Sequence, residues 1–279
     1  MNRNLRFSIV TPSLNQGFYL EEALLSVSNQ KPAPFEHLVM DGGSQDSSLD
    51  ILRRHTLDRE RHLWWRSASD RGQSHALNEG FLRASGDIVG WLNSDDRYRP
   101  GCFEAVGKAF RDYPEADIIY GDYTWIDERG RLLRIRREIE FSYFVLLYHR
   151  VLYIPTTATF FRRRIFQEGN LLDETLGFAM DYEFFLRLAM RGYRFQHIPA
   201  LLGDFRFHEK SKTCSMPEKQ LQEQNRVIQL YSPLLRNRGS FWARCFVFAV
   251  LRSTAAAVRY FEKMIRGYYF DQLRRPTVA

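Results

Sequence analysis

Short apolar runs alternate with helical patterns over the first hundred residues of the chain. We predict strands for the apolar runs and helices for the segments between them; the strand and helix pairs cover residues 7–10 and 19–30, 37–40 and 47–55, 63–66 and 74–84, and 88–92 and 100–113. A strand, a helix and another strand in succession need a crossover connection, so the strands run parallel and are buried between helices on both faces. The pattern therefore predicts an α/β fold with a mostly parallel sheet.

Polar and acidic residues follow each of the four predicted strands. In such a sheet a ligand binds beyond the carboxyl ends of the strands, and these ends carry Thr11-Pro12-Ser13, Asp41-Gly42-Gly43-Ser44, Ser69-Asp70-Arg71-Gly72 and Asn93-Ser94-Asp95-Asp96. Each segment alone fits an ordinary turn or helix cap. Three of them contain carboxylates, however, and several like charges at one sheet edge are costly without a counter-ion or a ligand. We therefore expect one shared crevice that binds a ligand.

The pattern changes after residue 118. A strand is predicted to end at residues 120–122, a turn and an arginine-rich ribbon follow at 129–137, further strands are predicted at 157–161, 195–198 and 201–207, and a helix is predicted at 181–190. A polar run at 218–229 then leads to a helix and a C-terminal tail, without a flexible linker that would mark an independent domain.

The composition indicates a folded chain with one large domain or two modest ones. Of the 279 residues, 44% are apolar and 15% are aromatic, which supplies a substantial core and excludes a disordered chain. The net charge of +7 is uneven, because residues 241–279 contain seven basic and two acidic residues. The basic excess therefore belongs to a tail on a nearly neutral body, so we expect no nucleic-acid partner.

The cysteines and the apolar segments bear on location. Cys102, Cys214 and Cys245 are odd in number and widely spaced, which argues against a disulfide framework or a thiolate zinc site and fits a reducing compartment. The first apolar run is too short for a signal peptide. The apolar stretch at 241–258 contains Arg244 and Arg252 and falls short of the span of about 20 apolar residues that crosses a membrane. We expect a cytoplasmic protein without a transmembrane helix.

The neighbouring carboxylates of Asp95 and Asp96 directly follow a run that reads as a buried strand. Two negative charges at such a place cost free energy unless a divalent cation binds both. Oxygen ligands of this kind suit Mg²⁺ or Mn²⁺. Such ions are commonly held by one or two carboxylates together with substrate phosphates. This combination suggests a nucleotide diphosphate as the ligand.

Five motifs, taken together, resemble an inverting glycosyltransferase of family 2 with the GT-A fold. The resemblance covers roughly residues 5–213, and it rests on the order and spacing of motifs that are each weak alone. The motifs are Phe7-Ser-Ile-Val-Thr-Pro-Ser-Leu-Asn, Met40-Asp-Gly-Gly-Ser-Gln-Asp, Ser69-Asp-Arg-Gly-Gln-Ser-His-Ala-Leu-Asn, the segment 86–96, and Ala179-Met-Asp-Tyr-Glu.

The resemblance implies a role for individual residues. Donor binding is implied for Thr11 and Pro12 against the nucleotide, Asp41 on the base or ribose, Asp70 on the nucleoside, and Gly43, Arg71 and Asp95 in the same set. Asp95 and Asp96 stand in the family's DxD position, with Asp96 as the first choice of metal ligand and His208 as a late histidine that completes the metal or diphosphate site. Asp181 matches the aspartate that activates the acceptor.

The resemblance also implies a division of the chain. We expect a GT-A catalytic domain, a Rossmann-like mostly parallel sheet flanked by helices, at 1–215, with a nucleotide-binding half at about 1–98 and an acceptor half at about 99–215. Residues 216–279 are expected to form a helical extension.

The chemistry of these residue types fits the implied roles. A carboxylate such as Asp181 can hold and remove the proton of an acceptor hydroxyl, which is otherwise a poor nucleophile. A divalent cation stabilises the charge of a departing nucleoside diphosphate. One carboxylate base on the face opposite the leaving group gives an in-line displacement, so the anomeric configuration is expected to invert.

Plainer readings of the same residues stand beside these. Asp181 can cap the helix that it begins, His208 can be a partly buried histidine satisfied by a neighbour, and Lys210 and Lys212 can be solvated loop charges. Two departures from the family pattern, His75 in the third motif and Thr156-Thr157 before the strand at 157–161, put the donor or acceptor preference in doubt.

The C-terminal tail predicts an amphipathic helix. At about 100° per residue, Arg244, Arg252, Arg259, Lys263, Arg266 and Arg274 share one arc of a helix over 241–274, opposite an apolar arc. An apolar face and a basic face suit the surface of an anionic bilayer, with the basic stems reaching the head groups. The alternative is a helix packed on the catalytic domain with solvated arginines.

The arginines at 129–137 and 162–164 can recognise a phosphorylated acceptor, or pair with Glu138 and Glu140.

The sequence therefore favours a metal-dependent glycosyltransferase acting on a nucleotide-diphosphate sugar, with a glycan or lipid-linked glycan as acceptor, at the cytoplasmic face of a membrane. Two alternatives remain: a catalytically silent nucleotide-sugar-binding or membrane scaffold protein, and a nucleotidyltransferase, although no glycine-rich triphosphate loop with a lysine lies near residues 11–20. The donor, the acceptor and the oligomeric state stay undefined at this stage.

Overall fold

The computed structural model describes residues 5–58, 62–208, 211, 216–233 and 241–269. Lys210 and Lys212, Cys214, and the end of the predicted tail helix with Arg274 lie outside these described residues.

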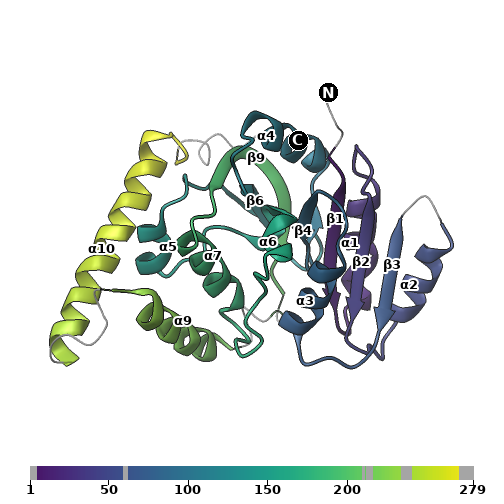
Figure 1. Cartoon of the computed structure of the whole chain (residues 1–279), viewed down its shortest axis with the longest axis horizontal. Coiled ribbons are helices and arrows are strands. Elements are labelled where there is room, and N and C mark those ends of the chain that lie inside the picture. The colour runs from purple at the N-terminus through teal and green to yellow at the C-terminus, as the bar shows by residue number, and fades with distance from the viewer. Residues whose placement is uncertain (1–4, 59–61, 209–210, 212–215, 234–240, 270–279) are drawn as a thin grey trace.

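A nine-stranded sheet forms the centre of the molecule (Figure 1). Its path is β3-β2-β1-β4-β8-β6-β9-β5, and β7 pairs with β6 off this path. Six strands run in one direction, and β5, β7 and β8 run against them. The strands are β1 (Phe7–Ser13), β2 (Glu36–Asp41), β3 (Leu63–Ser67), β4 (Ile88–Trp91), β5 (Arg97–Tyr98), β6 (Ile118–Ile126), β7 (Leu132–Arg136), β8 (Thr159–Arg162) and β9 (Phe195–Arg206).

Helices cover both faces of this sheet. They are α1 (Gly17–Ser28), α2 (Ser48–Thr56), α3 (Gln73–Arg83), α4 (Cys102–Asp112), α5 (Tyr143–His149), α6 (Arg164–Gln167), α7 (Met180–Met190), α9 (Pro217–Tyr231) and α10 (Phe241–Ile265), with a short 3-10 helix, η2 (Thr156–Ala158). Because side chains alternate along a strand, Val10 of β1 packs with α3, α5 and α7, whereas Phe7 and Ile9 pack with α1 and α4. Burial on both faces explains why the β1 sequence is a continuous apolar run.

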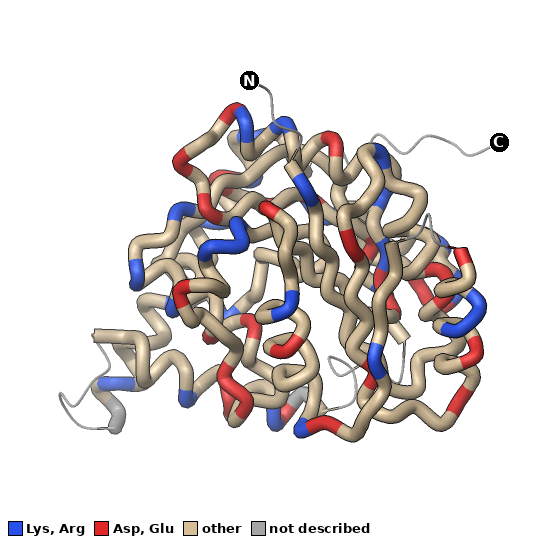
Figure 2. The backbone as a smooth tube through the Cα atoms, turned by 45° about the vertical axis from the view of Figure 1, so that its right-hand side comes forward, with Lys and Arg blue, Asp and Glu red and all other residues tan. Residues whose placement is uncertain are grey.

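The expected α/β class and mostly parallel sheet are confirmed. The first four strands and the helices that follow them are present, with ends that differ by a few residues from the predicted ones. The glycine at 192 ends α7 in the left-handed conformation, with φ 85°. Basic and acidic residues are interspersed along the backbone in Figure 2.

Two sequence predictions in the second half are wrong. The two strands predicted at 195–198 and 201–207 form one strand, β9, which is twelve residues long. Pro199, which lacks an amide hydrogen, lies where the pairing of β6 with β9 shifts its register next to Gly121, so the strand continues past it. The same pairing continues β6 through Asp122 to Ile126, so the strand does not end at 122.

The C-terminal helices pack on the rest of the chain. Val227 and Ile228 of α9 and Ala255 of α10 belong to the larger core cluster, together with residues of α5 and α7. None of the helices in the described parts of the chain combines the length and the apolar character needed to cross a bilayer. The proposed boundary between a catalytic domain and an extension at residue 215 stays a prediction.

The basic arc of α10 lies differently from the sequence expectation. Arg259 and Lys263 are buried against the carboxylate of Glu138, so these side chains do not reach outward to head groups. The alternative with solvated arginines on a packed helix also fails for these two residues. A buried carboxylate without a partner is strongly destabilising. The ion pairs with Arg259 and Lys263 therefore keep this side of α10 turned toward Glu138.

Candidate active site

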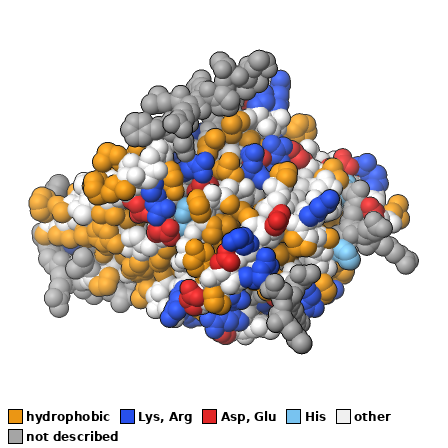
Figure 3. All heavy atoms as spheres, turned by 90° about the horizontal axis from the view of Figure 1, so that it is seen from above, with side chains coloured by type: hydrophobic (Ala, Val, Ile, Leu, Met, Phe, Trp, Pro, Cys, Tyr) orange, Lys and Arg blue, Asp and Glu red, His pale blue; other side chains and the backbone are white. Residues whose placement is uncertain are grey.

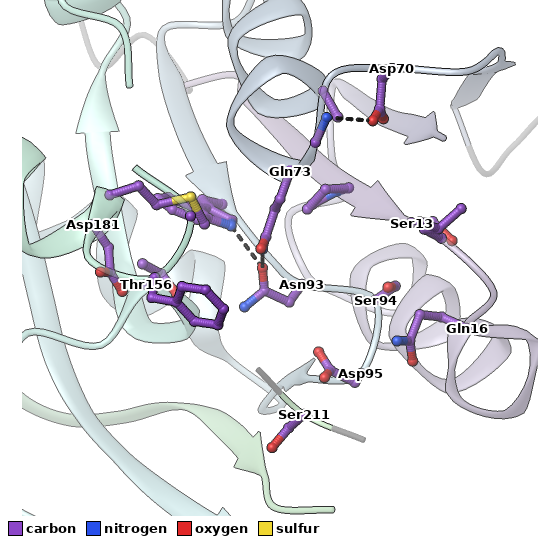
Figure 4. A pocket seen from close by; sticks show the side chains of 18 of the residues that line it. Ser13, Gln16, Asp70, Gln73, Asn93, Ser94, Asp95, Thr156, Asp181 and Ser211 are labelled. Carbon is purple, nitrogen blue, oxygen red and sulfur yellow. Dashed lines mark hydrogen bonds between the residues drawn. The ribbon is translucent and has the colours of Figure 1, made fainter. Parts of the chain in front are cut away.

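A pocket of about 380 Å³ opens beyond the carboxyl ends of β1 and β4. Both halves of the chain contribute to its wall, which Figure 4 shows from close by. The lining residues are Pro12, Ser13, Leu14, Gln16, Asp70, Gly72, Gln73, Ala76, Trp91, Asn93, Ser94, Asp95, Thr156, Gly177, Phe178, Met180, Asp181, Phe205, Ser211 and Gln220. Four of the predicted site residues, Pro12, Asp70, Asp95 and Asp181, therefore share one pocket.

Asn93 lies at the centre of the pocket and has a fixed orientation. Its Oδ1 accepts hydrogen bonds from Trp91 Nε1 at 2.9 Å and from Gln73 Nε2 at 3.0 Å. These two donors identify the oxygen side of the amide, so Nδ2 is directed to Asp96 Oδ2 at 3.4 Å. The polar residues of β4 and α3 are thereby held in one arrangement.

Asp95 and His208 face each other at the edge of this pocket. Asp95 Oδ2 lies 3.0 Å from His208 Nε2, and the centroid of the His208 ring lies 4.8 Å from that of Tyr19, with the rings tilted by 45°. The reading of His208 as a histidine satisfied by a neighbour is thus compatible with the structure, and the neighbour is the carboxylate of the acidic motif. Asp95 is partly exposed, with a fifth of its side chain open to solvent.

The donor chemistry of this pair fits a divalent cation. Asp95 Oδ2 and His208 Nε2, which lie 3.0 Å apart, are a carboxylate oxygen and an imidazole nitrogen, and these two residues would hold the ion. Within the described residues no three His, Cys, Asp or Glu side chains gather closely enough to hold a metal ion by themselves. Remaining ligands would therefore come from water or from the phosphates of a substrate.

Asp96, the first choice of metal ligand from the sequence, lies inside the protein. It is 2% exposed and does not line the pocket. Its Oδ1 accepts the backbone amide of Arg206 at 2.8 Å, and its Oδ2 accepts the hydroxyl of Thr157. Burial, reinforced by the charge of Asp95, raises the pKa of Asp96 to about 8. The structure thus assigns Asp96 to internal hydrogen bonds and leaves Asp95 as the carboxylate that faces the pocket.

Arg206 organises the acidic motif, and only its place two residues before His208 could have pointed to it in the sequence. Its Nε donates to the carbonyl of Asp95 at 2.7 Å while its own amide binds Asp96. The guanidinium also donates to Glu22 and lies over the ring of Tyr19, 4.9 Å from the centroid. The buried side chain and the amide of Arg206 therefore hold Asp95 and Asp96 in position.

Asp181 enters the pocket from the first turn of α7. Its Oδ1 accepts the amide of Tyr182 at 2.8 Å. The helix begins one residue earlier, at Met180, with Ala179 in the capping position. Asp181 therefore does not occupy the capping position, although it accepts an amide of the first turn.

Glu223 of α9 holds the loop that enters α7. Its two carboxylate oxygens accept the backbone amides of Gly177, Phe178 and Ala179 at 3.0, 2.7 and 2.9 Å. Three hydrogen bonds from one ionised group are strong and directional. The sequence pattern did not single out Glu223, because it lies in a polar helix 42 positions after Asp181.

Asp70 and the turn after β2 lie against each other at the far side of the pocket. Asp70 Oδ1 accepts the amide of Gly72 at 2.8 Å. A Cβ atom at Gly42 would lie 2.8 Å from Asp70 Oδ2, so a side chain at this position would displace the Asp70 carboxylate.

Four other predicted donor residues do not line the pocket. Thr11 is buried and its Oγ1 lies 2.9 Å from His37 Nε2. Asp41 is buried, and its carboxylate accepts hydrogen bonds from Gly43, Ser44 and Ser67 within the turn. Gly43 has a positive φ of 89°. Arg71 is exposed and pairs with Glu174 through Nη2 at 2.8 Å. Thr11, Asp41 and Gly43 shape the strand ends, and direct donor contacts for these four residues stay a prediction.

Several arginines considered for a phosphorylated acceptor are paired within the protein. Arg136 pairs with Glu138 and Arg137 pairs with Asp122. Arg164 pairs with Asp117, and Arg162 donates to the carbonyls of Phe110, Pro114 and Ala116. For these four residues the internal pairing accounts for their charge.

Comparisons with known proteins agree with this geometry. The family model described as glycosyl transferase family 2 matches residues 8–169. The O-antigen biosynthesis protein RfbC of Myxococcus xanthus is 34% identical over 47% of this chain, which covers 10% of that protein. An uncharacterized glycosyltransferase of Mycobacterium tuberculosis, Rv1514c, is 30% identical over 66% of this chain and 68% of its own length.

Solved structures show the same fold at low identity. Staphylococcus aureus TarS residues 1–349, in complex with UDP-GlcNAc, superposes with a TM-score of 0.63 at 20% identity over 88% of this chain and 71% of that chain. The mannosyltransferase PcManGT from Pyrobaculum calidifontis, in complex with GDP-Man and Mn²⁺, gives a TM-score of 0.58 at 16% identity over 91% of this chain and 74% of that chain. The GT-A fold is therefore confirmed.

Proposed function

Because the chain belongs to glycosyltransferase family 2, we propose that it moves a sugar from a nucleotide-diphosphate donor to a hydroxyl group of an acceptor, with inversion at the anomeric carbon. The observation that carries this proposal is the pocket that brings Asp95 and Asp181 together. In Figure 4, Asp181 lies on one side of the pocket and Asp95 on the other, with Asn93 between them.

The donor diphosphate is proposed to bind at Asp95 and His208. The TarS and PcManGT structures contain nucleotide sugars, and the second also contains Mn²⁺. A divalent cation held by Asp95 Oδ2 and His208 Nε2 would stabilise the negative charge of the departing nucleoside diphosphate. Asp96 and Arg206 support this end of the pocket by fixing the backbone and side chains of the motif.

The nucleoside is proposed to lie between the ends of β1 and β3. Pro12 and Ser13 provide one wall and Asp70 the other. An ionised Asp70 would accept hydrogen bonds from a ribose hydroxyl or from the base.

The acceptor is proposed to enter beside Asp181. As the acceptor oxygen forms its bond to the anomeric carbon, the bond from that carbon to the diphosphate oxygen breaks, and the hydroxyl proton passes to Asp181. Attack on the face opposite the leaving group inverts the configuration. Apolar neighbours such as Phe178 and Met180 suit the ring face of a sugar acceptor.

We propose a hexose as the sugar and a glycan or lipid-linked glycan as the acceptor, in polysaccharide or glycoconjugate assembly on the cytoplasmic side of a membrane. The similarity to an O-antigen biosynthesis protein supports this direction. Because the chain covers only a small part of that protein, the assignment rests mainly on the pocket.

The proposal is tested by thermal-shift screening of nucleoside diphosphates with and without Mn²⁺, followed by turnover assays. Ligands that bind the folded state stabilise it by mass action. We expect one nucleoside diphosphate to raise the melting temperature more in Mn²⁺, and sugar transfer to release that nucleoside diphosphate. Release of pyrophosphate would indicate nucleotidyl transfer and reject the proposal.

The role of Asp181 is tested separately by Asp181→Asn. We expect donor-induced stabilisation to remain while turnover falls by about a hundredfold or more, because a general base is lost. Asp112→Asn, on the exposed end of α4, serves as the surface control. Undiminished turnover of Asp181→Asn would reject Asp181 as the base.

A further inference from the structure

The wall of the pocket contains a hydroxyl group without a hydrogen-bond partner. Thr156 lines the pocket and is 7% exposed. Two other threonines of the same segment are hydrogen-bonded. Thr157 donates to the carboxylate of Asp96, and Thr159 donates to the carbonyl of Pro155 at 2.6 Å. Within the part of the chain that the structure describes, the hydroxyl of Thr156 makes no such bond and is available to a ligand.

The Thr156 hydroxyl opens to the pocket rather than to the protein interior. The unpartnered hydroxyls of two other pocket residues, Ser13 and Ser211, are enclosed by protein atoms, whereas that of Thr156 is not. Because the residue is otherwise buried, the small open part of its surface faces the pocket that it lines. Figure 4 shows its side chain close to Asp181. Polar groups in such a wall normally have a partner, so a bound substrate would supply it.

The position of Thr156 is fixed by its neighbours. It begins η2, in which the amide of Ala158 donates to the carbonyl of Pro155 at 3.0 Å. The next residue, Thr157, is bound to Asp96. A β-branched side chain such as that of threonine also has few rotamers. A hydrogen-bonding group that is held in place before the ligand arrives favours one ligand orientation over others.

Thr156 lies between the two ends of the pocket. Asp181 is close to it on one side (Figure 4), and on the other side Thr157 connects the segment to Asp96 of the acidic motif. In the proposed function, on which this inference rests, the acceptor oxygen lies at Asp181 and the donor diphosphate at Asp95. The sugar that is transferred must then lie between these two groups. The hydroxyl of Thr156 therefore faces the sugar rather than the nucleoside.

We propose that Thr156 is a specificity-determining residue, whose hydroxyl forms a hydrogen bond with a hydroxyl group of the transferred sugar. A threonine hydroxyl can both donate and accept, as a sugar hydroxyl can. A site built for such a bond discriminates against an analogue that lacks the sugar hydroxyl, because the protein group is then left unpaired. Thr156 thereby selects among sugars that are carried on the same nucleoside diphosphate.

The experiment compares nucleotide sugars with their own nucleoside diphosphates, by isothermal titration calorimetry in Mn²⁺. The probes are UDP-GlcNAc with UDP, GDP-mannose with GDP, and dTDP-glucose with dTDP, and the pair that the natural chain binds most tightly is used for the variants. Thr156→Val removes the hydroxyl and keeps the shape of the side chain. We expect it to weaken binding of the nucleotide sugar by about fivefold to tenfold and to leave binding of the nucleoside diphosphate unchanged.

Two further variants separate the hydroxyl from a structural effect. Thr156→Ser keeps the hydroxyl and should bind the nucleotide sugar like the natural chain. Thr254→Val makes the same chemical change at an exposed position of α10. This helix forms the end of the molecule where hydrophobic side chains gather in Figure 3, and none of its described residues lines the pocket. Thr254→Val should therefore bind both probes like the natural chain.

Deoxy analogues of the bound nucleotide sugar test the same hydrogen bond from the side of the ligand. We expect one of them to bind the natural chain more weakly, and to lose nothing further in Thr156→Val, because both changes remove the same bond. If the natural chain binds every deoxy analogue like the parent compound, the proposal is overturned without recourse to any variant.

Two other results also overturn the proposal. One is undiminished binding of the nucleotide sugar by Thr156→Val, and the other is an equal loss of binding for the nucleotide sugar and the nucleoside diphosphate. Both leave the proposed function intact. Failure of the natural chain to bind any of the three pairs would instead contradict the proposed function itself.

Discussion

Asp95 and Asp96 are neighbours in the sequence but occupy opposite environments. Asp95 faces the pocket and His208, whereas Asp96 is buried under Thr157 and the Arg206 amide. The sequence indicates that an acidic pair follows β4, but it does not indicate which carboxylate faces outward. That choice depends on β9 and η2, which lie more than sixty positions away in the chain.

The two residues should therefore respond differently when the carboxyl group of each is replaced by an amide. We expect Asp95→Asn to weaken Mn²⁺-dependent nucleotide binding by about tenfold or more with little change in melting temperature. Asp96→Asn should chiefly affect stability, since its hydrogen bonds are internal. Titration of nucleotide with and without Mn²⁺, together with thermal unfolding, measures both. Equal losses of Mn²⁺-dependent binding in folded variants would contradict this separation.

His37 provides a test of pH dependence. Burial, with a smaller effect of His55, lowers the pKa of His37 from 6.5 to about 3. Because the unfolded chain binds a proton below pH 6.5 and the folded chain does not, the stability that His37 contributes is complete above about pH 6.5 and is lost as the pH falls toward 3.

We expect His37→Gln, which cannot titrate, to reduce this acid sensitivity. As the pH falls from about 6 to about 4, the free energy of unfolding should decrease more steeply for the natural chain than for the variant. The difference between the two slopes should be up to about 1.4 kcal/mol per pH unit. Chemical denaturation across this range gives the two slopes. Identical slopes would show that His37 is not the group responsible.

At the level of elements, local pattern predicted the first half of the fold well. Each strand there is a short apolar run and each helix has a helical apolar pattern. The rules for crossover connections then leave few possible topologies for the parallel strands. The second half was predicted less well. The helices α5 and α6 are too short to show a period, and the pairing with β6 joins the two strands predicted at 195–198 and 201–207 into one.

The candidate site follows the same division. Pro12, Asp70, Asp95 and Asp181 could be found from motifs at element ends. Arg206 and Glu223 could not, because their contacts join segments that are distant in the sequence.

Glu223 is predicted to position Asp181. In Glu223→Gln, one carboxylate oxygen becomes an amide donor that repels the amide hydrogens of the 177–179 loop. We expect kcat to fall by about tenfold while the KM for the donor changes little, because the donor end of the pocket is untouched.

The control for this variant is Glu218→Gln, an exposed position on the same helix. Glu223→Asp, which keeps the charge, should recover part of the activity. If Glu223→Gln, Glu223→Asp and Glu218→Gln all changed kcat and stability equally, Glu223 would have only a general structural role.

At the scale of the whole molecule, α10 is attached by buried ion pairs in addition to its apolar contacts. Glu138→Gln would leave Arg259 and Lys263 buried without their counter-charge. Loss of one partner from a buried ion pair costs about 3–5 kcal/mol. We expect a drop of that order in the free energy of unfolding, measured by urea denaturation.

Glu140→Gln is the matched control for Glu138→Gln. Glu140 and its partner Arg266 are partly exposed, at 49% and 29% of their side chains, so this pair should contribute only about 0–1 kcal/mol. Similar losses for the two variants would mean that Glu138 does not determine how α10 is held.

Helix α9 has a consequence for how stability and turnover are linked. Its Glu223 accepts the amides of the loop beside Asp181, and its Val227 and Ile228 lie in the same core cluster as Ala255 of α10. A substitution that loosens the packing of α10 should therefore also disturb the loop that leads to Asp181.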